Sequence, residues 1–328
     1  DEAEDPISLL FEPVSESSLQ IFEKSRHEDL PAFKSQNEAV KWYLKGLNES
    51  GLCLMDNLKR HPNPLTQLRL FNFFCIFHLV RYMALLEAFY CGENIRPVLL
   101  DFSGIAPSQS SVARASEMAY TQMHKSINRF YAWGYAQKLK EKDYSKEDLL
   151  QSETPVYDEK KKASVEFSTL WNLAKERASA CATDDAARLV FGETMYDMLA
   201  LEASSHPVNC LKILGTSAGM LYPPDQMHPN KRFVLSQDIL EMILRSTVSP
   251  DEVLSGNDMR NRLWERFGII IGGSTYEIEK LQSSGMLLQI DEDSLERNFT
   301  SFAALLESMD FAEVMADGIL QIRLGGSD

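Results

Sequence analysis

LFNFFCIFHLVRYMALLEAFY, residues 70–90, is the most apolar stretch of this 328-residue chain. Its longest run without a formal charge ends at Val80, which is shorter than the roughly 18 apolar residues that a membrane-spanning helix needs. Four aromatic residues at helical spacing normally pack inward, so we expect a buried core helix and no membrane partner. The alternative is that this apolar surface forms a groove for a partner helix.

On the amino-terminal side of this stretch, residues 1–36 contain Pro6, Pro13 and Pro31, which predict an irregular lead-in. Apolar residues then recur at three- and four-residue spacing over residues 37–58, which predicts a helix that ends at the His-Pro-Asn-Pro sequence of residues 61–64. On the carboxyl-terminal side, residues 97–102 predict a buried strand and residues 110–141 a long helix. Residues 37–141 therefore form the first part of a helical domain.

Residues 142–162 are dense in charges of alternating sign and predict a solvated hinge. The following region, residues 163–232, is expected to contain two helices, over 163–181 and 184–204. It ends in a proline-rich loop over residues 215–231. If Ser217 in this loop is catalytic, we expect the preceding residues 211–214 to form a strand.

The last region, residues 233–328, has the clearest start and stop signals. We expect a helix to begin at the Ser-Pro-Asp-Glu capping box of residues 249–252, with proline as its first residue, strands over 269–271, 286–290 and 319–324, and a helix over 293–309. Three helices with two or three short strands are typical of a winged helix. The predicted fold class is therefore mainly α, with a helical amino-terminal domain and a small winged-helix-like α+β carboxyl-terminal domain.

The formal net charge of −15 argues against a polyanion as the partner of the whole surface and favours contacts with other protein subunits. The five cysteines are widely spaced and form no Cys-x-x-Cys pair, which is typical of a reducing compartment. Because the chain also opens on acidic residues, without the features of a signal peptide, we expect a cytoplasmic protein.

A local basic cluster is the exception to this acidity. Arg260, Arg262 and Arg266 lie on one predicted helix and Lys280 on the next, so together they could meet a phosphate backbone. Residues 235–328 nevertheless contain seven Lys and Arg against seventeen Asp and Glu, a balance of 7 − 17 = −10. We therefore favour ion pairs within a protein-binding module and keep nucleic-acid binding as the alternative.

The segment Gly215-Thr216-Ser217-Ala218-Gly219 matches the G-x-S-x-G nucleophile elbow, in which a serine lies between a buried strand and a helix. It resembles the GTSAG motif of patatin-type lipases, and the resemblance implies Ser217 as nucleophile and Asp317 as its partner. Prolines 223 and 224 leave little room for the required helix, so we favour a glycine-flanked loop.

The six histidines show no metal-binding spacing, and we expect neither a metal nor a cofactor. His78 falls within the apolar stretch and is predicted to be a hydrogen-bonded core residue.

Two further parts of the chain resemble accessory proteins of bacterial anti-phage defence operons. The first is VLLDFSG at 98–104, followed by SVARASEMAYTQMHKSINRFY at 111–131, and the second is LWERFGIIIGG at 263–273. The resemblance implies a non-catalytic subunit that works beside an ATPase or a nuclease. Together with the acidic charge, it predicts an adaptor or scaffold subunit of a multi-protein complex. A nucleic-acid-binding winged-helix protein and a serine hydrolase are the alternatives.

Overall fold

The computed structural model describes residues 37–92, 94–155, 165–202, 207–226, 228–284, 290, 292–316 and 318–324. Within these residues the fold is mainly helical, as predicted, with eleven helices and seven short strands. The helices are α2 (Glu38–Arg60), α3 (Pro64–Cys91), α4 (Ser111–Glu141), α5 (Lys146–Gln151), α6 (Val165–Ser179), α7 (Asp184–Glu202), α8 (Pro207–Ser217), α9 (Gln237–Arg245), α10 (Gly256–Phe267), α11 (Thr275–Ser283) and α12 (Glu292–Ser308). The strands are β1 (Val98–Leu99), β2 (Leu221–Tyr222), β3 (Arg232–Phe233), β4 (Val253–Ser255), β5 (Ile269–Ile270), β6 (Ala312–Val314) and β7 (Leu320–Arg323).

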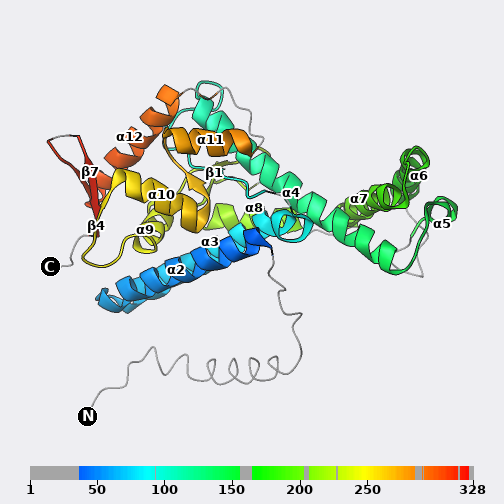
Figure 1. Ribbon diagram of the computed structural model, residues 1–328, viewed down its shortest axis with the longest axis horizontal. Helices are drawn as coiled ribbons and strands as arrows, with labels where there is room; N and C mark the ends of the chain where they lie inside the picture. The colour runs from blue at the N-terminus through cyan, green and yellow to red at the C-terminus, as the bar shows by residue number, and fades with distance from the viewer. Residues whose placement is uncertain are drawn as a thin grey trace, which may run out of the picture.

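The molecule consists of a large body and an arm formed by α5, α6 and α7, which Figure 1 shows at opposite ends of the long axis. Helix α4 belongs to both, because it packs on α3, where Phe130 contacts Tyr90, and also on α7 of the arm. Gly192 of α7 permits this junction, since a side chain there would overlap the carbonyl of Ala132 on α4. The arm has a small core of its own, which contains Leu149, Trp171 and Phe191.

A small sheet joins distant parts of the chain inside the body. Strand β1 pairs with β5 in parallel, and a parallel bridge joins Leu100 to Phe233 of β3, which in turn pairs with β2 in the antiparallel sense. The buried amide of Asn298 on α12 ties the ends of β1 and β5 together. It donates to the carbonyls of Leu100 and Ile271 at 2.8 and 2.7 Å and accepts from the N–H of Phe102.

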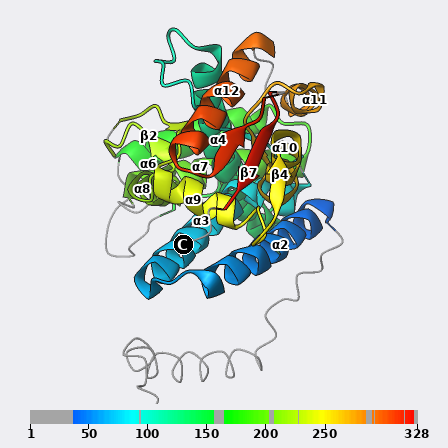
Figure 2. The same ribbon diagram turned by 90° about the vertical axis from the view of Figure 1, so that its left-hand side faces the viewer.

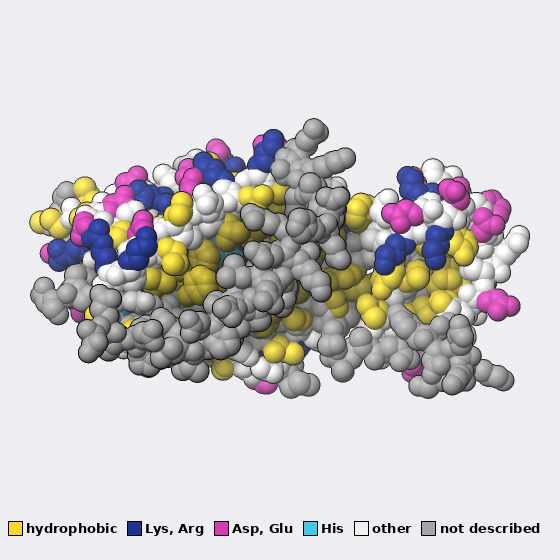
Figure 3. All heavy atoms as spheres, turned by 90° about the horizontal axis from the view of Figure 1, so that it is seen from below, with side chains coloured by type: hydrophobic (Ala, Val, Ile, Leu, Met, Phe, Trp, Pro, Cys, Tyr) yellow, Lys and Arg dark blue, Asp and Glu magenta, His cyan; other side chains and the backbone are white. Residues whose placement is uncertain are grey.

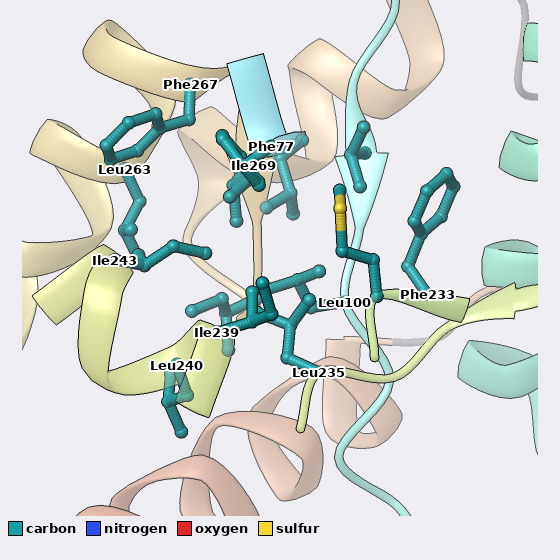
Figure 4. Packing of buried hydrophobic residues seen from close by; sticks show 14 of the residues in the cluster. Phe77, Leu100, Phe233, Leu235, Ile239, Leu240, Ile243, Leu263, Phe267 and Ile269 are labelled. Atoms are coloured by element: carbon teal, nitrogen blue, oxygen red, sulfur yellow. The ribbon is translucent and has the colours of Figure 1, made fainter. Parts of the chain in front are cut away.

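The hydrophobic core of the body is continuous from Leu54 on α2 to Ile322 on β7. Figure 4 shows side chains from α3, α9, α10 and the strands pointing toward one another, with Phe77 close to Phe267 and Leu100 close to Phe233. This core crosses position 233, where the sequence predicts a domain boundary. The separate carboxyl-terminal domain remains a prediction, and its residues share their core with α2, α3 and α4.

Strands β4, β7 and β6 form a second, antiparallel sheet in that order, at the edge of the body below α12 in Figure 2. The helix predicted to begin at residues 249–252 is wrong, because Asp251 adopts a positive φ of 65° and the chain then enters β4. The carboxylate of Glu252 still accepts from the N–H of Ser249 at 3.0 Å, so the sequence forms half of a capping box without a helix.

Most other predicted elements are confirmed within one to three residues: the helices that became α2, α4, α6, α7 and α12, and the strands that became β1, β5 and β7. Part of the predicted hinge forms α5, whose Leu149 is buried. The predicted lead-in, the predicted strand over 286–289 and Asp317 lie outside the described residues.

Candidate functional site

The basic face of α10 lies against the end of another helix of the same chain. Arg262 and Arg266 share a face of α10, and both side chains reach the carbonyls that follow the last turn of α9. Arg266 Nη1 donates to the carbonyls of Ser246 and Thr247 at 2.7 and 3.1 Å, and Arg262 Nη1 donates to that of Thr247 at 3.0 Å. Cations stabilise a helix carboxyl terminus because they satisfy its free carbonyls and oppose its dipole.

Arg262 also forms a bidentate ion pair with Glu252, with N–O distances of 2.5 and 2.9 Å. The hydrogen bonds from Arg262 lower the pKa of Glu252 to about 2, and the carboxylate in turn raises the pKa of Arg262. The side chains of Arg262 and Arg266 are 29% and 13% exposed. Both arginines therefore stabilise contacts within the chain.

The other two basic candidates also have partners within the chain. Arg260 stacks on the ring of Phe299 at 4.3 Å and lies 3.8 Å from the carboxylates of Glu277 and Glu296. Lys280 lies over the rings of Trp264 and Tyr276, at 5.2 and 5.1 Å. The four cations are thus spread over separate contacts and do not form one open basic surface.

Ser217 is the last residue of α8, so a helix precedes the serine and β2 follows it. The nucleophile elbow requires the opposite order, and the strand expected over residues 211–214 is wrong. The two glycines of the motif have packing roles: Gly219 ends the helix with a φ of +76°, and a side chain at Gly215 would overlap Leu221. The Oγ atom of Ser217 accepts from Gln226 at 3.2 Å.

His78 is 6% exposed, as predicted for a core residue, and its Nε2 atom lies 3.4 Å from the hydroxyl of Ser50. Burial, with a contribution from Arg81, lowers its pKa to about 3, so the ring is neutral near pH 7. The described part of the chain contains no group of three or more His, Cys, Asp and Glu side chains that could hold a metal ion.

The outer face of α3 is exposed. The sequence analysis favoured a buried core helix here and kept a surface for a partner helix only as the alternative. Residues 70–80 contain no Lys, Arg, Asp or Glu, and yet Phe71, Asn72, Cys75 and Leu79 are exposed. Leu65 and Leu68 extend the same face toward the start of the helix. Because a helix that is apolar on every side is normally predicted to be core, periodicity could not separate the outer face from the inner one.

We call this surface the α3 face: Leu65, Leu68, Phe71, Asn72, Cys75 and Leu79. Figure 3, which views the side of the molecule that carries α2 and α3, shows hydrophobic side chains gathered in a band. Among the described helices, α3 has the length and the apolar character of a membrane-crossing helix, and 61% of its most apolar window is buried within the protein.

Comparison with known proteins found no family model, no curated protein and no solved structure that matches this chain.

Proposed function

We propose that this protein is a non-catalytic adaptor or scaffold subunit of a multi-protein complex, and that another subunit binds the α3 face. The single observation that supports the proposal is the exposure of an uncharged stretch of α3 in a chain of which one residue in four is charged. Leu79 is 47% exposed and Phe71 43% exposed. Contiguous exposed apolar side chains mark interaction surfaces, because their burial against a partner is favourable.

The partner that fits best is an amphipathic helix. The side chains Leu65, Leu68, Cys75 and Leu79 recur every three to seven residues along one side of α3, which is the spacing at which helices pack. The exposed lysines of the neighbouring helix α2 each pair with a carboxylate of the same helix, as Lys45 does with Glu49, so apolar contact is the main contribution we expect from this surface.

The bacterial defence context and the cytoplasmic location belong to the same proposal. The context comes from the resemblance of residues 98–104, 111–131 and 263–273 to accessory proteins of anti-phage operons. In that context, the chemistry would reside in the partner, an ATPase or a nuclease.

The test is affinity purification of the tagged full-length chain from its native host, with Leu79→Glu as the variant and Leu173→Glu as the control. Leu173 on α6 has a similar exposure, 50%, but lies on the arm. We expect a stoichiometric protein partner that survives nuclease treatment, is lost with Leu79→Glu and is kept with Leu173→Glu. Retention of every partner by Leu79→Glu would contradict binding at the α3 face, and flotation of the pure protein with lipid vesicles would indicate a membrane instead.

A winged-helix nucleic-acid-binding protein is the second candidate. The observation that favours it is the antiparallel sheet β4-β7-β6, which follows α9 and closes with a hairpin directly after α12. Helix α12 carries four acidic residues and one arginine, and the arginines of α10 have internal partners. We therefore propose that this module, if it is winged-helix-like, contacts protein; duplex DNA binding that weakens steeply with salt would favour the alternative.

A further inference from the structure

A cavity of about 540 Å³ lies between the loop that follows β1 and the segment that joins β2 to β3. Gly104, Ala106, Pro107 and Ser108 line one side, and Tyr222, Pro223, His228, Asn230, Lys231 and Arg232 line the other. The cavity is part of the body and is separate from the residues of the α3 face. Its size falls in the range of small-molecule sites, which is about 300–1,000 Å³.

The ammonium group of Lys231 forms no direct ion pair with a described side chain, although the charge of Asp225 acts on it from further away. The residue is 1% exposed, and its Nζ atom donates to the carbonyls of Pro223 and Asp225, both at 2.6 Å. No carboxylate of the described residues lies within 4.0 Å of it. Burial lowers the pKa of Lys231 and the nearby Lys212 lowers it further, whereas the charge of Asp225 raises it. A buried ammonium whose hydrogen-bond partners are neutral carbonyls is unfavourable, and an anion in the adjoining cavity would relieve this cost.

Arg232 supplies a second cation, held in a fixed position. Its Nη1 atom lies 3.2 Å from the carboxylate of Asp101 and donates to the carbonyl of Ile105 at 2.6 Å, and the guanidinium lies 5.2 Å from the centre of the Tyr222 ring. The Nε atom of Arg232 is buried and has no hydrogen-bond partner. A guanidinium that is already ordered loses little entropy when it binds an anion.

The cavity lining is rich in donors although the chain is acidic. Lys231 and Arg232 contribute positive charge, and Ser108, His228 and Asn230 add polar groups, whereas Glu117 is the one carboxylate among the lining residues. Asp101 pairs with Arg232, whereas Lys231 forms no ion pair with a described residue. Tyr222, Pro107 and Pro223 provide apolar surface beside these groups.

We propose that this cavity binds a small organic anion whose phosphate or carboxylate group lies against Lys231 and Arg232 and whose carbon skeleton packs on Tyr222 and the two prolines. Phosphates and carboxylates share the chemistry that a fixed guanidinium and an ammonium recognise.

Thermal unfolding of the full-length protein tests the proposal, because a ligand that binds only the folded state raises the melting temperature. The probes are AMP, inorganic phosphate, citrate and adenosine, each at millimolar concentration. We expect AMP or citrate to raise the melting temperature and adenosine to leave it unchanged. A preference for AMP and phosphate over citrate would identify a phosphate site, and the reverse preference a carboxylate site. No shift with any of the three anions, or an equal shift with adenosine, would overturn the proposal.

Two variants locate the binding. Lys231→Met removes the ammonium group and is expected to weaken binding of the effective anion by about tenfold or more in isothermal titration. Tyr222→Ala, at a residue that is 47% exposed, should weaken AMP but not inorganic phosphate. The control Lys59→Met makes the same change in net charge at a remote exposed site of α2. If Lys231→Met fails to fold, Arg232→Gln takes its place; unchanged affinity in the folded variant would exclude this cavity as the site.

Discussion

Helices α3 and α10 meet in the core, and they differ in which kind of side chain is exposed: α3 exposes apolar residues, whereas the arginines of α10 are largely covered. The middle turns of α3 have no formal charge, yet part of this stretch faces solvent, whereas α10 carries three arginines, of which Arg260 and Arg266 are each 13% exposed. The two helices touch through Phe77 and Phe267, whose ring centres are 5.4 Å apart. Residue type therefore did not decide which side of each helix is covered. The neighbours decided it: the carbonyl groups at the end of α9 receive the arginines, and no described element covers the outer face of α3.

The largest effect is expected where the two helices touch. Phe77 is 2% exposed and packs edge-to-face on Phe267. Phe77→Ala should lower the free energy of unfolding by about 4 kcal/mol, through lost burial and the cavity that remains. Urea denaturation followed by circular dichroism measures this loss. A loss below about 1 kcal/mol would show that the contact between α3 and α10 is not part of the stable core.

The buried side of α3 should also make stability depend on pH. The pKa of His78 is near 3 in the folded protein and about 6.5 in the unfolded chain, so the unfolded state binds the additional proton between these values. The stabilisation is complete above about pH 6.5 and is lost as pH falls toward 3, by roughly 5 kcal/mol.

Unfolding free energies measured from pH 7 to 5 test this assignment, because Glu252, whose pKa falls from 4.5 to about 2, contributes only below about pH 4.5. In His78→Leu the slope between pH 7 and 5 should be flatter than in the wild type. An unchanged slope would mean that His78 is not the titrating group; Ser50, Tyr43 and Arg81 are the polar groups around it.

Removal of an α10 arginine should have a smaller but clear effect. Arg266→Ala leaves the carbonyls of Ser246 and Thr247 without this donor and should cost about 2 kcal/mol. Chemical denaturation measures the change, with Lys280→Ala, which loses a cation from the next helix, as the control of equal charge. An equal effect in the two variants would indicate a general electrostatic contribution and no specific cap at the end of α9.

The smallest effect is expected on the α3 face. Leu65 is 69% exposed, and Leu65→Gln should change the free energy of unfolding by less than about 0.5 kcal/mol. The same denaturation experiment measures it. A loss above 1 kcal/mol would show that another part of the chain packs on this face in solution, which would remove the basis for the adaptor proposal.

Local signals sufficed to predict the elements, because each depends on neighbours in sequence. Proline at positions 62 and 64 separates α2 from α3, and the side chain of Ser110 caps α4 by accepting from the N–H of Ala113. The helix predicted at residues 249–252 did not form because the chain turns at Asp251 and enters β4, and the partner of β4 is β7, which is distant in sequence and enters no local pattern. The contact of Arg262 and Arg266 with the end of α9 could not be predicted for the same reason, because these residues are distant in sequence.

The sequence by itself determined that this chain is mainly helical, where its longest helices lie and that α3 contributes to the core, since apolar periodicity, caps and prolines act within a few residues. Only the tertiary structure decided the parallel pairing of β1 with β5, the internal role of the α10 arginines, the reversed order of elements around Ser217 and the exposure of one side of α3. Each of these depends on contacts between residues that are distant in sequence, such as Asn298 with Leu100, and such contacts leave no local pattern to read.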